Sequence, residues 1–538
     1  MPNKTKTILT PILLALAVIL GMFINSLLDS KRGAEASKTL AYSTNSKIDV
    51  IMSMINHSYV DSVDIRKIEE DAIPALLQNL DPHTVYIPAK KLKEVNEGIV
   101  GNFGGVGIQF YQLRDTITVV NTVIGGPAED AGILPGDRIV AVDDSIIAGR
   151  NLSTDGIMKL LRGKVGSHLK LTIFRRTLGK KINKDITRGT IPIKSVDIAY
   201  MANDTTGVIK INTFGMNTYK EFMASMEELK SQGMKKLIID LEGNPGGVMV
   251  IAINIINEFL GPNKLIVYTQ GKASRRMEYR SNGKGQYQDL PLTILIDESS
   301  ASASEIFSGA MQDNDRALIV GRRSFGKGLV QEQRQLSDGS AIRLTIARYY
   351  IPSGRSIQKS YKNGNNNYYE EVYKRYTDGE MLQRDSIHLS DTLKYHTSKG
   401  RVVYGGGGII PDKFVAIDTS DASMYWANLN GRLDKKQYLY EYTFDFMDKH
   451  RSEMKNIKDY KALEKYLSQF NLVDSLVAYA SKRGVKKDTD GLRRSRGLIR
   501  NSIEAFIGRH LLDDMGFYPI HYKYNPIMQR ALKEPSMK

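Results

Sequence analysis

The sequence predicts an α/β fold in which a largely parallel sheet forms the core and helical segments occupy both ends of the chain. A strand, a glycine-containing turn and an apolar helix follow one another twice, over residues 236–260 and 292–311. Such alternation is typical of parallel strands joined by crossover helices. Apolar residues also recur at helical spacing within residues 37–98, and again from about residue 420 onward. We therefore expect an α/β core with helical regions before and after it.

The composition indicates a globular protein of several domains and excludes some chemistries. The length of 538 residues suggests roughly three or four domains. The chain has no cysteine, which excludes disulfides, a thiolate nucleophile, a cysteine metal site and a lipid-anchored cysteine. It has 8 histidines but no His-Glu-x-x-His pattern, which disfavours a zinc peptidase, and we expect no metal and no other cofactor. The net charge of +16 comes without a nucleic-acid-binding motif, so it favours solvated faces or an anionic membrane surface over a nucleic-acid partner.

Residues 1–36 carry the pattern of an export signal or a membrane anchor. Lys4 and Lys6 precede an apolar run over residues 8–28. Residues 34–36 (Ala-Glu-Ala) resemble a cleavage site but lie far past that run, so we favour an uncleaved anchor over a removed signal peptide. Positive charge on the short N-terminal side fits export of the rest of the chain. We therefore expect the protein in the cell envelope, anchored to the membrane on the exported side of the inner membrane (the periplasm).

Residues 37–98 form the next region, which we expect to be mostly helical. It includes a turn over residues 80–84, where Asp81 and Pro82 precede His83. We interpret His83 as a turn residue and not as a catalytic histidine.

Two glycine-rich stretches mark a binding domain over residues 99–187. Glycines free the backbone of residues 104–108, so that consecutive N–H groups can converge on a carboxylate. Together with a second stretch at 126–137, this pattern resembles a β-rich PDZ domain, which implies capture of a peptide C-terminus and addition of the peptide as an edge strand. Tight turns without a ligand are the alternative, and phosphate binding is disfavoured because no P-loop lysine follows. The expected carboxylate-binding residues are Gly105, Val106, Gly107 and Ile108.

Ser302 lies at a predicted strand-to-helix turn. The apolar run over residues 292–297 is typical of a buried strand, and apolar residues from Ala303 to Met311 fall on one face of a helix. A serine at such a turn is exposed and has helix N–H groups beside it, as in a nucleophile elbow. Ser302 and Glu305 also fit a capping box, in which the serine only satisfies helix N–H groups. This motif alone leaves both interpretations open.

A glycine-flanked lysine, Lys327, follows an expected strand at residues 317–321. A serine hydroxyl needs a base to act as a nucleophile, and lysine can take the place of histidine. The lysine must be neutral, and with an ordinary pKa near ~10.4 about one lysine in a thousand is neutral at pH 7. Burial lowers this pKa, and Phe325 suits a dry approach of the amine. A solvated lysine in a glycine turn is the alternative.

The residues around both motifs resemble the carboxyl-terminal processing (tail-specific) peptidases. The match consists of Ser-Ala-Ser-Ala-Ser-Glu at 300–305, Met-Gln-Asp at 311–313 and Phe-Gly-Lys-Gly-Leu-Val-Gln at 325–331. The resemblance covers about residues 65–415 and implies a ClpP/crotonase-like core with an inserted PDZ domain. It also implies a serine–lysine dyad, with Ser302 as nucleophile and Lys327 as base, supported by Asp313 and Gln331.

A second glycine turn over residues 243–247 joins the strand at 236–241 to an apolar helix. N–H groups at such a turn, beside a serine nucleophile, can form an oxyanion hole, although a plain loop is the alternative. The resemblance implies that a glycine of this turn and the residue after the nucleophile supply the donors. Glu242 stands where the family commonly has arginine, so the local salt bridges should differ from the family pattern. The expected donors are Gly246 or Gly247, and Ala303.

The remaining sequence completes the expected organisation. The core extends over residues 188–415, with an alternating strand at 341–350 and a polar insertion at 361–401 that we expect to be mostly loop. Residues 416–538 form a helical domain, for which packing or self-association into a homo-oligomer is the expected role.

Together these features predict an exported serine endopeptidase that cleaves proteins or peptides with an accessible C-terminus. The PDZ domain would hold the terminal carboxylate while the preceding chain lies across Ser302. One alternative is a catalytically silent PDZ-type binding scaffold, against which the presence of both Ser302 and Lys327 argues. A third hypothesis, an acyl-CoA hydratase-like enzyme, is disfavoured by the PDZ insertion and by the Phe-Gly-Lys-Gly loop.

Overall fold

The computed structural model describes residues 46–113, 115–387, 391–433 and 436–537, and the chain divides into two units between Leu77 and Gln78. The first unit contains two helices, α2 (Lys47–Ser58) and α3 (Ile65–Leu77). The anchor expected over residues 1–36 lies outside the described residues. No helix within the described ranges is long and apolar enough to cross a membrane.

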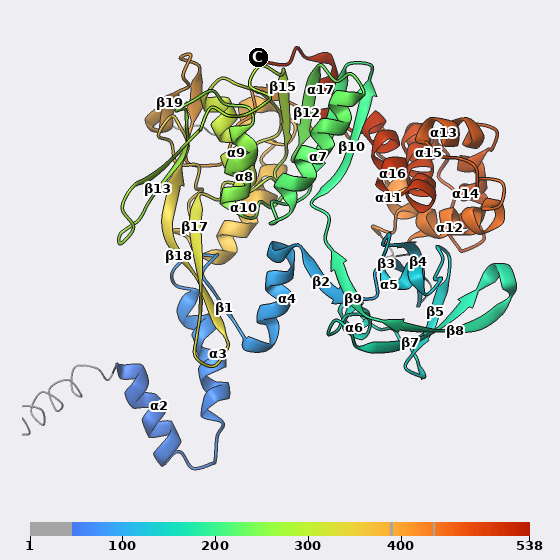
Figure 1. The fold of residues 1–538 in the computed structure, drawn as a ribbon, viewed down its shortest axis with the longest axis horizontal. Helices are drawn as coiled ribbons and strands as arrows, with labels where there is room; N and C mark the ends of the chain where they lie inside the picture. The colour runs from blue at the N-terminus through green and yellow to red at the C-terminus, as the bar shows by residue number, and fades with distance from the viewer. Residues whose placement is uncertain (1–45, 114, 388–390, 434–435, 538) are drawn as a thin grey trace, which may run out of the picture. The chain divides into compact units, whose positions relative to one another are not determined.

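A six-stranded sheet forms the core of the second unit, in the order β10-β11-β12-β15-β16-β21 (Figure 1). Strand β10 is antiparallel to β11, and the remaining neighbours are parallel. Leu237 and Ile239 of β12 pack into a cluster with helices α7, α8 and α9, whereas Ile238 packs with helices from the C-terminal end. Burial on both faces explains why the strands are continuous apolar runs. The elements are β10 (Val196–Asn203), β11 (Thr206–Ile211), α7 (Thr218–Ser231), β12 (Lys236–Asp240), α8 (Met249–Asn257), β15 (Leu292–Ile296), α9 (Ala303–Asp313), β16 (Leu318–Gly321) and β21 (Lys413–Phe414).

A second, antiparallel sheet lies beside this core and carries the strand that follows the lysine loop. Its order is β1-β18-β13-β14, with β17 also paired to β18. Because β1 pairs with β18, the turn at residues 80–84 comes close to β18 and to its partner β17, the strand that follows Lys327. The strands are β1 (Val85–Ile87), β13 (Leu265–Gln270), β14 (Met277–Arg280), β17 (Leu329–Gln335) and β18 (Ala341–Tyr350).

The binding domain is β-rich, as the PDZ resemblance implies. Its strands follow the order β3-β4-β5-β7-β8, with β6 paired to β5, so that β3 is an edge strand. A two-stranded ladder of β2 and β9 connects this domain to the rest, and α4 precedes it. The elements are α4 (Ala89–Val100), β2 (Asn102–Gly105), β3 (Ile108–Leu113), β4 (Thr116–Thr122), α5 (Pro127–Asp130), β5 (Arg138–Val142), β6 (Ser145–Ile146), α6 (Thr154–Leu161), β7 (His168–Arg175), β8 (Lys180–Thr187) and β9 (Gly189–Pro192).

The C-terminal region is helical, which confirms that part of the predicted fold class. Helices α11 to α15 share a hydrophobic cluster that also includes Ile520 of α16. Tyr440 of α12 packs against Tyr111 of β3 with tilted rings whose centroids are 3.9 Å apart. Helix α17 packs instead on β15 and β16 of the core sheet. The elements are α11 (Met424–Leu429), α12 (Tyr438–His450), α13 (Tyr460–Leu467), α14 (Leu472–Ser481), α15 (Thr489–Leu512), α16 (Asp514–His521), the 3-10 turn η4 (Tyr522–Tyr524) and α17 (Pro526–Lys533).

The polar insertion at 361–401 is more ordered than the sequence predicts. It contains a 13-residue helix, α10 (Asn365–Thr377), and a short hairpin of β19 (Lys394–His396) and β20 (Val402–Tyr404). The buried residues of α10 are Tyr368 and Arg375, so polar contacts hold the helix in place. Such a helix shows little apolar periodicity, which is why the expectation of a loop was wrong.

Candidate active site

Ser302 stands at a sharp elbow between β15 and α9. Its backbone has φ 57° and ψ −114°, a region that a residue with a side chain rarely adopts. Every residue of α9 is buried, whereas Ser302 itself is half-buried and reachable from solvent. The strained conformation and the buried helix behind it are those of a nucleophile elbow.

Glu305 joins the serine elbow to the lysine loop. Its carboxylate is fully buried and accepts hydrogen bonds from the backbone N–H groups of Ser302 and Lys327, each at 2.8 Å. It also accepts from the N–H of Gly326 at 2.7 Å and from the hydroxyl of Ser324 at 2.5 Å. Burial raises the pKa of Glu305, and these four donors oppose that shift. The bond from the Ser302 N–H to Glu305 is the glutamate half of a capping box. The same carboxylate also fixes the distance between the serine elbow and the lysine loop.

Lys327 faces a neutral partner. Its Nζ donates to Oε1 of Gln331 at 3.0 Å, and Nε2 of Gln331 donates to the backbone carbonyl of His83. Because Nε2 is engaged by that carbonyl, the amide oxygen must point toward the lysine. Burial lowers the pKa of Lys327, and the charge of Arg343 lowers it further. Glu305 and Asp81 oppose this shift.

Tyr349 of β18 makes a second link between the two loops. Its hydroxyl lies 3.1 Å from the carbonyl oxygen of Ser302 and also contacts the carbonyl oxygen of Lys327. The side chain is 1% exposed, and burial raises its pKa well above the usual value, so it stays a neutral donor. The serine and the lysine are thus held by one carboxylate and one phenol in common.

The glycine turn lies directly against the serine elbow. A Cβ on Gly246, whose φ is 101°, would come within 2.7 Å of the Ser302 Cβ and 2.8 Å of the Ala303 nitrogen. The Gly246 amide donates to Oδ1 of Asn244 at 2.8 Å, so it is already engaged. Among the described residues, the amides of Gly247 and Ala303 have no hydrogen-bond partner. Of the two glycines predicted as donors, the hydrogen-bond pattern therefore favours Gly247.

Asp313 is not placed with the serine and the lysine. It ends α9, the helix that Ser302 begins, and its carboxylate pairs with Arg355 at 2.8 Å, both side chains being 0% exposed. Its second oxygen accepts from the N–H of Ser353 at 2.9 Å. With a rise of about 1.5 Å per residue, the 11 residues of α9 separate Asp313 from the elbow by roughly 15 Å. These contacts place Asp313 in a buried ion pair with Arg355, away from Ser302, and the supporting role that the resemblance implies for Asp313 stays a prediction.

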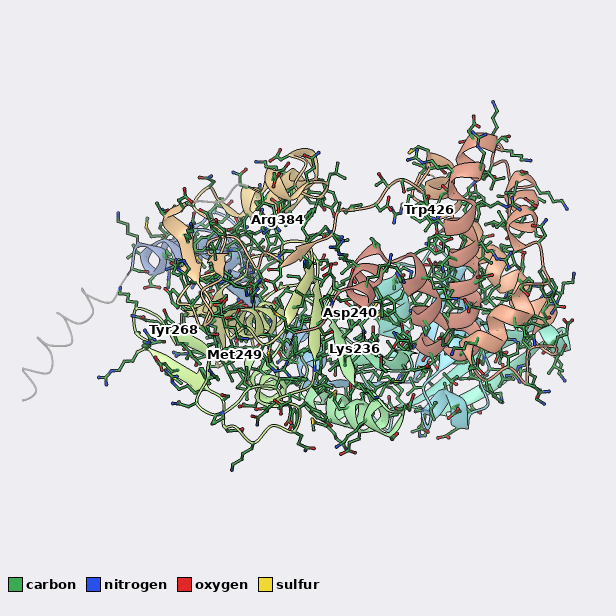
Figure 2. All side chains as sticks on the ribbon, turned by 90° about the horizontal axis from the view of Figure 1, so that it is seen from above. Lys236, Asp240, Met249, Tyr268, Arg384 and Trp426 are labelled. Carbon is green, nitrogen blue, oxygen red and sulfur yellow. The ribbon has the colours of Figure 1, made fainter. Side chains whose placement is uncertain are left out.

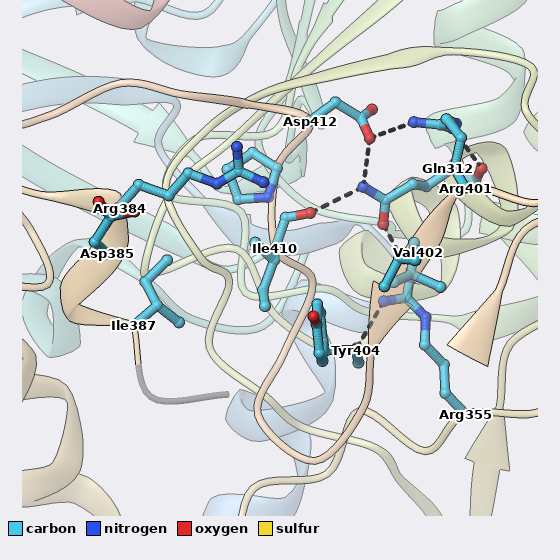
Figure 3. A pocket seen from close by; sticks show the side chains of 12 residues that line it. Gln312, Arg355, Arg384, Asp385, Ile387, Arg401, Val402, Tyr404, Ile410 and Asp412 are labelled. Atoms are coloured by element: carbon cyan, nitrogen blue, oxygen red, sulfur yellow. Dashed lines mark hydrogen bonds and ion pairs between the residues drawn. The ribbon is translucent and has the colours of Figure 1, made fainter. Parts of the chain in front are cut away.

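A cavity of about 570 Å³ lies at that far end of α9 (Figure 3). Gln312, Arg355 and Arg401 line it, and Asp412 accepts hydrogen bonds from Gln312 and Arg401. The cavity lies at the opposite end of α9 from Ser302. In the described ranges, no group of three metal-ligating side chains could hold a metal ion.

Helix α10 packs on the lysine loop. The guanidinium of Arg375, 2% exposed, donates to the backbone carbonyls of residues 323, 324 and 325. Tyr368 packs edge-on against Phe325 and lies 3.0 Å from Nε2 of His83. Burial and the nearby Lys327 charge lower the pKa of His83 to about 4, so this histidine is neutral. No sequence pattern indicates these contacts, or those of Tyr349, because each joins segments far apart in the chain.

The PDZ-type loop has the geometry of an edge-strand binder. Gly107 has φ 77°, and the carbonyls of Val106 and Gly107 accept from the N–H groups of Ala128 and Val123 at 2.8 and 2.9 Å. Ile108 then starts β3, whose outer edge is unpaired within the described sheet. Gly105 lies in β2, opposite Gly189. The loop is therefore fixed by the helix that follows β4, with an open strand edge beside it.

Ser302 at the elbow and Lys327, whose pKa is lowered, are thus joined through backbone contacts to the same carboxylate and the same phenol. The model of peptidase family S41 matches residues 205–364, the PDZ domain model matches 104–186, and a family of unknown function (DUF8443) matches 429–513. The chain belongs to peptidase family S41.

Curated relatives of this chain are described as probable CtpA-like serine proteases. A probable CtpA-like serine protease of Staphylococcus epidermidis is 35% identical over 313 residues, which cover 58% of this chain and 62% of the relative. The corresponding protein of Staphylococcus aureus strain COL is 33% identical over 344 residues, 64% of this chain and 67% of the relative. The chain thus spans about 62% of the length of the first relatives it matches. Among solved structures, a photosystem II D1 C-terminal processing protease is 30% identical, covering 57% of this chain and 83% of its own, with a TM-score of 0.34.

Proposed function

We propose that this protein is a serine endopeptidase in which Ser302 is the nucleophile and Lys327 the general base. The observation that carries the proposal is the shared Glu305 carboxylate, which holds the backbones of both residues at 2.8 Å. In this mechanism the neutral Lys327 amine takes the proton of the Ser302 hydroxyl as that oxygen attacks the scissile carbonyl. The amides of Gly247 and Ala303 stabilise the developing oxyanion.

The second half of the reaction reuses the same groups. The Lys327 ammonium gives its proton to the leaving amine, and the peptide remains as an ester on Ser302. Water then hydrolyses this acyl-enzyme, with Lys327 again accepting the proton. Gln331 supports both steps because a neutral amide oxygen contacts the amine without adding a negative charge that would hold the proton on it.

We also propose that substrates are recognised by their C-terminal tail. The support is the glycine loop at residues 105–108 beside the open edge of β3, which suits a carboxylate and an added strand. Export to the periplasmic side, a membrane anchor within residues 1–36 and self-association remain proposals that rest on the sequence pattern.

Two alanine variants test the proposal. Ser302→Ala and Lys327→Ala should each abolish cleavage of an unfolded protein with an apolar tail, while circular dichroism stays unchanged. Normal cleavage by the Lys327→Ala protein would show that another group is the base. A comparison of protein C-termini in cells with and without the active enzyme then identifies substrates, and an unchanged set of C-termini favours the rival proposal of a silent PDZ scaffold.

A further inference from the structure

Two acidic residues stand where β12 enters the oxyanion turn. Asp240 ends β12 and is 1% exposed, and its carboxylate accepts from the N–H of Glu242 at 2.7 Å. Lys210 of β11 places its Nζ 3.3 Å from Asp240 and donates to the backbone carbonyl of Glu242 at 2.8 Å. Lys210, on a neighbouring strand, therefore supplies the positive charge here. Residue 242, where the family commonly has arginine, carries a carboxyl group instead.

The acidic groups outnumber the bases at this point. Asp297 accepts from the N–H of Gly243 at 2.9 Å, so three carboxyl groups surround the first residues of the turn. Burial raises the pKa of Glu242, and the charges of Asp240 and Asp297 raise it further. Repulsion of this kind is relieved by a proton on Glu242 or by further donors that face the carboxyl groups.

Those donors come from the last segment of the chain, residues 514–537, which we call the C-terminal strap. The hydroxyl of Tyr522, 3% exposed, donates to Asp240 at 2.5 Å. The Nδ2 of Asn525 lies 3.1 and 3.2 Å from the two carboxyl oxygens of Glu242. Figure 2 shows Asp240 beside the red C-terminal helices. The strap lies beyond both the S41 match and the DUF8443 match.

We propose that the C-terminal strap is a positioning element of the active site, which holds the oxyanion turn through Tyr522 and Asn525. The strap touches the start of the turn, and Gly246 of the same turn lies against Ser302. Its effect therefore falls on stabilisation of the oxyanion and not on binding of the substrate. The proposal rests on the proposed peptidase function only for its kinetic readout.

An exchange of hydrogen-bonding groups tests the contact in the full-length protein. Asn525→Asp removes the amide N–H donor that faces both carboxyl oxygens of Glu242, and it should lower kcat about tenfold, with KM changed less than about twofold. The double variant Glu242→Gln with Asn525→Asp restores one amide and one carboxylate in swapped positions, and should recover most of kcat. Arg530→Ala is the matched control, because Arg530 lies on α17 and pairs with Glu534 on the exposed face.

Hydrogen–deuterium exchange of residues 240–250 gives a readout that needs no catalysis. Asn525→Asp should speed exchange in this segment, and the swapped double variant should slow it again. Unchanged kcat and unchanged exchange in a folded Asn525→Asp protein would overturn the proposal, as would a swapped variant no better than Asn525→Asp. If Asn525→Asp does not fold, Tyr522→Phe, which removes one hydroxyl, decides by the same two measurements. If the wild-type protein cleaves no substrate, the peptidase function is refuted. Hydrogen–deuterium exchange alone then decides the role of the strap.

Discussion

The contact between Lys327 and Gln331 gives the sharpest test of the base assignment. Gln331→Glu replaces a neutral oxygen 3.0 Å from the Lys327 Nζ by a charged one. At that distance two unit charges interact by about 5 kcal/mol at an effective dielectric constant near 20, which equals about four pKa units as an upper bound. Opposite charges this close shift pKa values by about 1–3 in proteins, so we expect the pKa of Lys327 to rise by that amount.

A higher pKa of Lys327 lowers the rate of cleavage at neutral pH. Catalysis needs the neutral amine, and below its pKa the neutral fraction falls about tenfold for each unit by which the pKa rises. The acidic limb of kcat/KM should therefore move up by about 1–3 pH units. Activity should be lost at neutral pH and regained in alkaline buffer. The assay is initial-rate cleavage of a fluorogenic peptide with an apolar C-terminus between pH 6 and 10.

A control separates charge from the loss of the hydrogen bond to His83. Gln331→Met removes both side-chain hydrogen bonds without adding charge, so it should lower the rate at every pH and leave the acidic limb in place. An acidic limb that stays fixed in Gln331→Glu would refute Lys327 as the base.

Three further substitutions test other contacts. Gly246→Ala should lower kcat at least about 100-fold, because its methyl group meets the Ser302 Cβ at 2.7 Å and displaces the turn, as single-turnover kinetics will show. Arg375→Met should destabilise the core by about 1–3 kcal/mol, because three backbone carbonyls lose their buried donor while Glu371 keeps Lys359 and Arg323, whereas the exposed Lys374→Met should leave Tm unchanged. Tyr349→Phe should cost about 1–3 kcal/mol of stability and, because it loosens both loops, about tenfold in kcat, and wild-type kinetics in this variant would argue against the shared-phenol link.

The parts of the site that the sequence could predict are those set by neighbours in the chain. The strand, turn and helix around Ser302 are one continuous stretch, and apolar periodicity with a glycine or serine at the break indicates such a unit. The glycine turn before α8 follows from the same pattern. Local sequence could not show Tyr349 or the strap, because their contacts with the site come from β18 and η4, which only the fold brings close.

The surroundings of Asp313 and the helix of the insertion could not be predicted for a different reason. Asp313 matches a family position, but position in a motif does not fix the direction of a side chain at the far end of a helix from Ser302. Helix α10 is held by Arg375 and Tyr368, residue types that are mostly expected on surfaces or at interfaces. A sequence that buries polar groups against backbone carbonyls has no apolar period from which to predict the helix.

Another lysine, Lys359, is buried near the lysine loop, and its surroundings differ from those of Lys327. Burial lowers the pKa of Lys359 to about 8. Its Nζ pairs with Glu371 at 3.0 Å and lies 3.9 Å from the ring centroid of Phe325, contacts that stabilise an ammonium.

Glu371 must itself stay charged for this pair to hold. Burial works against its charged form, but the hydrogen bond from Arg375, together with the charges of Arg375 and Lys359, lowers the pKa of Glu371 to about 2. Removing the proton of Lys359 would leave the Glu371 carboxylate without this partner. Lys327 loses only a bond to a neutral amide when it gives up its proton, since Gln331 can still present its oxygen to the remaining N–H groups. The cost of the neutral amine is therefore lower at Lys327, and that difference supports the proposal of Lys327 over Lys359 as the base.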